Sequence, residues 1–121
     1  MRVVVIAKTP QEFAQWVKEQ QAPPAQPTDA LAQQGQQVLL AGACIGCHTI
    51  NGTAANGKVG PNLTHVASRT SLAGGMLADT EGNMKRWLAN PPGVKAGSVM
   101  PNLNLSNQDI DALTAYLLSL K

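Results

Sequence analysis

Apolar residues recur at helical spacing in three separate segments of this chain, and a cap and a proline stop mark a fourth helix. In the first segment, Phe13, Trp16 and Val17 stand three and four positions apart, as on one face of a helix. The preceding Thr9-Pro10-Gln11-Glu12 supplies an N-cap residue, a proline at the first helical position and a glutamate that completes a capping box. The pattern therefore predicts a helix over residues 10–20.

Two more helices are expected in the middle of the chain. The first covers residues 29–42, where Leu31, Gly35, Val38, Leu39 and Gly42 recur at helical spacing. The second begins at Asp79 or Thr80, either of which can cap it, and ends near Asn90 because Pro91-Pro92 cannot continue a helix.

The last predicted helix begins at Ser106, where Asp109 takes the place of the usual glutamate in a capping box. One face of this helix carries Ile110, Leu113, Leu117 and Leu120. Residues 49–75 and 93–104 are rich in loop-forming residues, so we expect loops there, with one short helical turn near 63–68.

The start of the chain has a different pattern. Residues 3–7 are mostly β-branched and predict a short strand, which we expect to be poorly satisfied because a lone strand edge has no partner. Residues 21–27 contain three prolines and predict an extended, semi-rigid linker. The apolar run at the start ends at Lys8, too soon for a signal peptide, and no segment has the ~20 apolar residues of a membrane span.

Composition narrows the possible partners. Only 13% of the 121 residues are charged and the net charge is +2, with no basic run, so we expect no nucleic-acid partner. Only 3% of the residues are aromatic. A bulky apolar cofactor would supply the core volume that large rings otherwise provide.

The strongest chemical motif is Cys44-x-x-Cys47-His48. Two thiols at this spacing can each form a thioether to a haem vinyl group, and the adjacent imidazole can bind the iron. The motif predicts one covalently attached haem c, with His48 as an axial ligand.

Three other uses of the same residues remain open. The two cysteines could form a structural disulfide or a redox-active dithiol, although no βαβ pattern accompanies them. A zinc site would need four ligands and would have to recruit His65 in an unusual arrangement.

The second axial ligand is expected to be a methionine, because a His/Met iron is an electron-transfer site. Met76, Met84 and Met100 are the candidates, with His65 as a bis-histidine alternative. Met84 falls within a predicted helix and reads as a core residue, and Met76 follows two glycines. Met100 lies in a loop before Pro101, from which it can extend over the iron, so we favour Met100.

Residues 28–121 resemble class I cytochrome c domains. The resemblance is carried by the Cys44–His48 motif and by Gly60-Pro61-Asn62-Leu63, Trp87-Leu88 with Pro91, Gly97 to Met100-Pro101 and the C-terminal helix. It implies an all-α fold, with three to five helices around one covalently bound haem.

The resemblance also implies roles for individual residues. Pro61 would offer its carbonyl to His48, and Gly35 would pack on Tyr116 where the first and last helices cross. Arg69 and Trp87 would approach a haem propionate, although a surface arginine and a core tryptophan are the plainer interpretations.

The first 20 residues resemble the end of the copper-binding, cupredoxin-like domain in subunit II of caa3-type cytochrome c oxidases. Residues 1–20 are then the C-terminal remnant of that domain, 21–27 a linker and 28–121 the cytochrome c domain. The copper ligands of that family are absent, since the only two cysteines belong to the haem motif.

The resemblance implies an electron relay. It would pass electrons from a donor cytochrome or other small redox protein to the copper centre of the same subunit, beside oxidase subunit I. With both axial positions filled, the isolated chain is expected not to be an enzyme. We expect it on the outer face of the bacterial membrane, tethered through upstream segments and not itself inserted.

Three alternatives remain. The chain could be a free-standing periplasmic cytochrome c, a module of another oxidoreductase, or a haem enzyme or ligand sensor.

Overall fold

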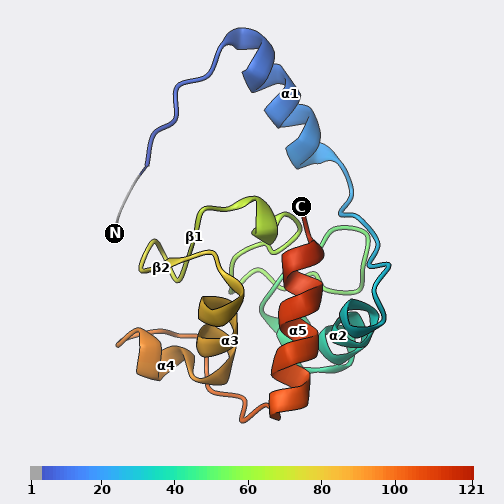
Figure 1. The fold of residues 1–121 in the computed structure, drawn as a ribbon, viewed down its shortest axis with the longest axis vertical. Coiled ribbons are helices and arrows are strands. Elements are labelled where there is room, and N and C mark those ends of the chain that lie inside the picture. The colour runs from blue at the N-terminus through green and yellow to red at the C-terminus, as the bar shows by residue number, and fades with distance from the viewer. Residues whose placement is uncertain (1–3) are drawn as a thin grey trace.

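The structure, a computed structural model, describes residues 4–121 (Figure 1). Its main helices are α1 (Pro10–Gln21), α2 (Ala30–Ala41), α3 (Glu81–Ala89), α4 (Pro91–Val94) and α5 (Asn107–Ser119). Two 3₁₀ turns, η1 (Ala43–Gly46) and η2 (Val66–Ser68), and two short strands, β1 (Ser71–Leu72) and β2 (Leu77–Ala78), lie between them. The expectation of an essentially all-α fold is confirmed.

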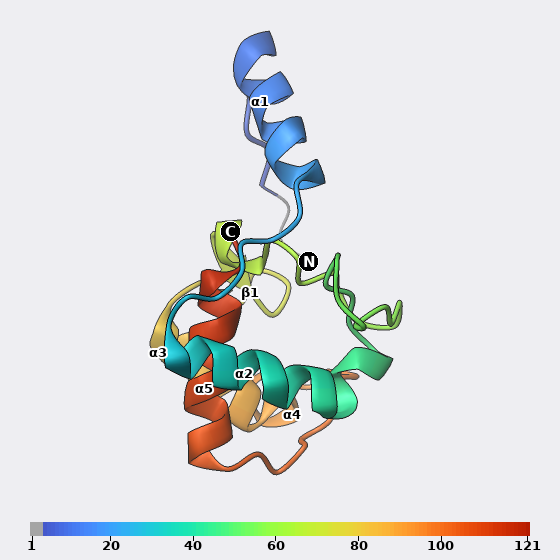
Figure 2. The same ribbon diagram turned by 90° about the vertical axis from the view of Figure 1, so that its right-hand side faces the viewer.

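Helix α1 forms for local reasons. The Glu12 amide donates to the Thr9 hydroxyl at 3.3 Å, and the Glu12 carboxylate accepts from the Thr9 amide at 2.8 Å, so the predicted capping box is present. The rings of Phe13 and Trp16 stack on the helix surface with their centroids 5.8 Å apart. No residue of α1 is buried, and the helix stands away from the other helices in both views (Figures 1 and 2).

The strand predicted for residues 3–7 is wrong for its described part. Residues 4–7 form no strand, and Val4, Val5 and Ile6 are exposed; Val3 lies outside the described residues. A strand is stable only when a neighbour accepts its backbone hydrogen bonds, and residues 4–121 place no strand beside this segment.

The proline-rich linker lies on the helical body. Pro24 and Pro27 are both buried, and the Gln33 amide donates to the Pro27 carbonyl at 3.2 Å. The His65 imidazole donates through Nε2 to the Ala22 carbonyl at 3.1 Å. Residues 23–27 form neither helix nor strand, and Pro24 and Pro27 hold the segment against the body instead of leaving it in open solvent.

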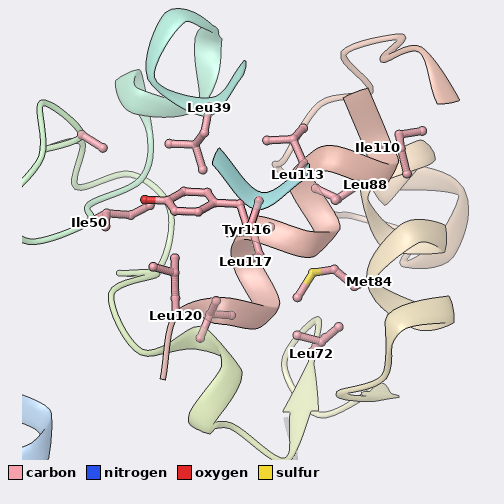
Figure 3. Close-up of a cluster of buried hydrophobic side chains, with 13 residues drawn as sticks. Leu39, Ile50, Leu72, Met84, Leu88, Ile110, Leu113, Tyr116, Leu117 and Leu120 are labelled. Carbon is pink, nitrogen blue, oxygen red and sulfur yellow. The ribbon is translucent and has the colours of Figure 1, made fainter. Parts of the chain in front are cut away.

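The core forms where α2 crosses α5 (Figure 2). A Cβ atom added at Gly35 would lie 1.9 Å from the Ala112 carbonyl oxygen and 2.8 Å from the Tyr116 Cβ, so only glycine allows this close approach. The predicted packing of Gly35 on Tyr116 is confirmed. The Tyr116 ring points toward the side of the core that holds Leu39 and Ile50 (Figure 3).

Helix α5 is the centre of the hydrophobic core. Its predicted apolar face is confirmed, because Ile110, Leu113, Leu117 and Leu120 are all buried. Helix α3 packs on α5 through Met84 and Leu88, drawn in Figure 3. At the edge of this contact, the Lys85 ammonium pairs with Glu81 at 2.8 Å and with Asp111 of α5 at 2.9 Å.

Two predicted loops contain more order than expected. Strands β1 and β2 pair antiparallel within and just after the 49–75 segment, with Ser71 opposite Ala78. The short turn predicted near 63–68 is present as η2. Pro91-Pro92 ends α3 as predicted but opens α4, since proline is compatible with the first turn of a helix.

No helix within residues 4–121 is long and apolar enough to cross a membrane.

Candidate functional site

The Cys44-x-x-Cys47-His48 motif folds as a tight turn directly after α2. The amides of Cys47 and His48 both donate to the Cys44 carbonyl, at 3.2 and 2.9 Å. This turn places the two thiols and the imidazole within one compact backbone segment. Both cysteines are half-buried free thiols, so the disulfide interpretation is not supported. Burial raises the pKa of the Cys44 thiol and favours its neutral form.

His48, the last residue of the motif, is a buried polar residue with 8% of its surface exposed. Its Nδ1 lies 2.8 Å from the carbonyl oxygen of Pro61. Because a carbonyl oxygen can only accept, Nδ1 carries the proton and Nε2 keeps its lone pair. A histidine oriented in this way is prepared to bind a metal through Nε2.

The backbone of Gly60 packs closely against the His48 imidazole. A Cβ atom at this position would lie 2.6 Å from the His48 Cε1 and 2.8 Å from Nδ1, closer than real Cβ atoms approach. The Gly60 amide also donates to the Cys47 carbonyl at 2.7 Å, and the Gly57 amide donates to the His48 carbonyl at 3.0 Å. The segment 57–61 therefore wraps the motif and fixes the ring plane of His48.

The zinc arrangement considered from the sequence is not formed. Within residues 4–121, no three His, Cys, Asp or Glu side chains gather where they could hold a metal ion. His65, the required fourth ligand, instead donates to the Ala22 carbonyl in the linker. This contact also counts against His65 as a second axial ligand.

The three methionine candidates lie in different environments. Met84 is only 2% exposed in the core of the α3–α5 contact, which confirms its interpretation as a core residue. Met76 is 57% exposed in the turn between β1 and β2. Met100 is half-buried and packs against the core cluster from its loop. Met100 is thus the methionine that combines loop backbone with a protected side chain.

Arg69 and Trp87 are placed on different elements. The Arg69 guanidinium donates to the carbonyl of Asn62, the residue after Pro61, so it lies close to the segment that holds His48. Burial raises the pKa of the Asp79 carboxyl, and the positive charge of Arg69 opposes this shift. Trp87 is half-buried on α3. Their approach to a haem propionate stays a prediction.

A cleft of about 360 Å³ lies between α1 and the loop around η2, lined by Trp16, His65 and Arg69 among others. Its walls contain neither cysteine of the motif nor His48. One side of the cleft is built by the exposed helix α1, through Trp16 and Gln20, so we place the functional site at the motif instead.

The residues present fit a covalently attached haem. Two free thiols flank a turn, and the adjacent imidazole is buried, oriented through Nδ1 and free at Nε2. Cys44 and Cys47 would hold the haem through thioethers, and His48 would bind its iron. The sequence did not predict the close packing of Gly60 on the His48 ring, because a glycine before a proline is usually only a turn signal.

Comparison with known proteins agrees with this geometry. The family described as Cytochrome c matches residues 32–121. The chain is 39% identical over 118 residues to cytochrome c oxidase subunit 2 of Alkalihalophilus pseudofirmus, covering 97% of this chain and 34% of that protein.

Two further relatives have the same name. The subunit 2 of Bacillus sp. strain PS3 is 38% identical over 116 residues, and that of Bacillus subtilis 33% identical over 115. Each match covers 91% of this chain and 32% of the relative, so the chain spans about a third of the length of these proteins. With a matched region that contains the motif, the Pro61 contact and the α2–α5 crossing, the chain belongs to the cytochrome c family.

Proposed function

We propose that this chain is a one-electron relay built on a covalently bound haem c, with His48 and Met100 as axial ligands. The haem would supply reversible one-electron exchange at its iron. The observation that carries the proposal is the orientation of His48, whose Nδ1 donates to Pro61 while its ring is buried beside Gly60.

The chain's own residues have separate tasks in this proposal. Cys44 and Cys47 anchor the cofactor covalently, so it cannot dissociate. Pro61 keeps the proton of His48 on Nδ1 and thereby keeps Nε2 available. Met100 would give the iron a second protein ligand, which would leave no open position for a substrate and would make the isolated domain a carrier instead of a catalyst.

The proposed acceptor is the copper centre of a cytochrome c oxidase subunit II, continuous with this chain, and the assembly includes oxidase subunit I. Three subunit 2 relatives about three times as long as this chain support this proposal. The exposed apolar side chains of residues 4–6 and of Phe13 and Trp16 also support it, because such residues are usually covered by the rest of their domain.

The donor is proposed to be a small cytochrome or another redox protein on the outer face of the membrane. From residue 28 onward the chain has six Lys and Arg residues and five Asp and Glu residues. Its net charge is therefore +1 before two haem propionates are counted and about −1 after them. Docking should therefore depend weakly on salt. A steep fall of the electron-transfer rate with added salt would argue against this docking mode.

Absorbance spectroscopy of the purified protein tests the haem. Soret and α bands that survive denaturation are expected, because thioether bonds persist when the protein unfolds. Met100→Ala should abolish the weak near-infrared band of a sulfur–iron bond and lower the reduction potential. An unchanged band would remove Met100 from the site.

Carbon monoxide binding separates this function from the haem-sensor alternative. A ferrous iron with both axial positions filled should bind carbon monoxide poorly at neutral pH, whereas an enzyme or ligand sensor should bind it readily. Met100→Ala provides the matched positive control, since it opens the position that Met100 is proposed to fill.

A further inference from the structure

Lys95 joins two loops that are distant in sequence. Its Nζ donates to the carbonyl oxygen of Ala73 at 3.2 Å, across 22 residues of chain. Ala73 lies in the turn between β1 and β2, and Lys95 stands five residues before Met100. The side chain is half-buried, so this contact is partly protected from solvent.

The backbone of Lys95 is fixed on both sides. Its amide donates to the Pro91 carbonyl at 2.9 Å, which ties it to α4, and its carbonyl accepts from the Ser98 amide at 3.0 Å. The second bond closes the turn that leads directly into Val99 and Met100. A movement of Lys95 would therefore displace the segment that carries Met100.

The turn that receives the ammonium has an unusual backbone. Ala73 has a φ of 54°, a left-handed conformation that residues other than glycine adopt at a cost. The turn is closed by the Gly75 amide, which donates to the Leu72 carbonyl at 3.0 Å. A Cβ atom at Gly74 would lie 3.1 Å from the Lys95 Nζ, so the absence of a side chain leaves room for the ammonium.

From these contacts we propose that Lys95 is a positioning residue for Met100. Its ammonium fastens the loop 95–100 to the β1–β2 turn through a charge-assisted hydrogen bond, which limits opening of the loop. The inference rests on the proposed function, in which Met100 binds the iron. It adds a residue that sets how firmly this ligand is held.

Imidazole titration of the ferric, haem-loaded protein measures this role. Imidazole can bind the iron only when the Met100 loop opens, so its apparent affinity reports the fraction of open loop. Lys95→Met keeps most of the aliphatic stem and removes the donor. We expect the apparent affinity for imidazole to rise about fivefold, as for loss of one hydrogen bond, and Lys95→Arg to restore most of the original value.

Lys85→Met is the matched control. It removes an ammonium that pairs with Glu81 and Asp111 between α3 and α5 and takes no part in the Lys95–Ala73 contact. The near-infrared band and the free energy of unfolding are measured for both variants. An equal change of imidazole affinity in both, or no change in Lys95→Met, would overturn the positioning role.

Met100→Ala separates failure of this inference from failure of the proposed function. A retained near-infrared band in Met100→Ala would refute the ligand assignment and, with it, the role of Lys95. A band lost in Met100→Ala together with unchanged imidazole affinity in Lys95→Met would refute the role of Lys95 alone.

Discussion

The Nδ1 of His48 lies 2.8 Å from the carbonyl oxygen of Pro61, thirteen residues further along the chain. This bond joins the motif turn to the loop that wraps it. Gly60 lies against the same ring, where a Cβ atom would come within 2.6 Å of Cε1. The orientation of one imidazole is therefore set by two consecutive residues, one as a hydrogen-bond acceptor and one by its lack of a side chain.

Gly60→Ala should disturb this arrangement directly. The added methyl group must displace the imidazole or the loop, and overpacking of this kind costs about 1–3 kcal/mol. We expect a lower yield of haem-loaded protein and a lower denaturation midpoint, measured by guanidinium titration. Gly82→Ala on α3 has open space around its Cβ and should leave stability unchanged or raise it by up to about 1 kcal/mol. Equal haem loading and equal denaturation midpoints in the two variants would contradict a role for Gly60 in orienting His48.

Gly35→Ala tests the crossing of α2 and α5. The new Cβ would lie 1.9 Å from the Ala112 carbonyl oxygen, which is backbone and cannot rotate away. The helices must separate, so we expect a loss of about 3 kcal/mol in the free energy of unfolding. Thermal unfolding of the haem-loaded protein followed by circular dichroism measures this loss. A variant as stable as the parent would show that the helices can separate without loss of packing.

Two deletions test whether the linker belongs to the cytochrome domain. Removing residues 1–20 deletes nearly all of α1. Because α1 has no buried residue, this deletion should leave stability almost unchanged. Removing residues 1–27 also takes away the buried Pro24 and Pro27 and the contacts to Gln33 and His65. We expect this longer deletion to cost about 1–2 kcal/mol more, from the apolar area lost.

Chemical denaturation of the two truncated chains, each with haem attached, gives the comparison. Identical denaturation midpoints would mean that the linker lies on the body without contributing to its stability.

Asp79 predicts a pH dependence of stability. Its Oδ1 is buried without a hydrogen-bond partner, and burial raises the pKa of the carboxyl above its usual 3.8, opposed by Arg69. The folded state therefore binds a proton more readily than the unfolded state, so this group favours folding more as pH falls through the mildly acidic range. Above that range the charged carboxylate is destabilising.

Asp79→Asn should accordingly raise stability at neutral pH and flatten its dependence on pH. Arg69→Gln should act in the opposite direction at neutral pH, because it removes the charge that favours the ionised carboxylate. Urea unfolding between pH 4 and 7 provides the measurement, with Glu19→Gln on exposed α1 as the control for loss of one negative charge. An unchanged pH profile in Asp79→Asn would show that other groups dominate it.

Much of this protein follows from local sequence. The capping residues Thr9, Asp29, Thr80 and Ser106 each bond to an amide three residues ahead, so helix starts are decided by neighbouring residues. The apolar face of α5 follows from spacing alone, and the Cys44–His48 motif identifies its cofactor because few other chemistries need these residue types at this spacing. These features depend on contacts within a few residues.

Only the tertiary structure decided the remaining features. The β-branched residues 4–7 have high strand propensity but find no neighbouring strand, so their local preference has no effect. The linker looks like a free spacer until Pro24 and Pro27 are seen to be buried. The close packing of Gly60 on His48, the buried Oδ1 of Asp79 and the Lys95–Ala73 bond depend on partners brought close by folding. Their energies depend on three-dimensional distance, which the order of residues along the chain does not specify.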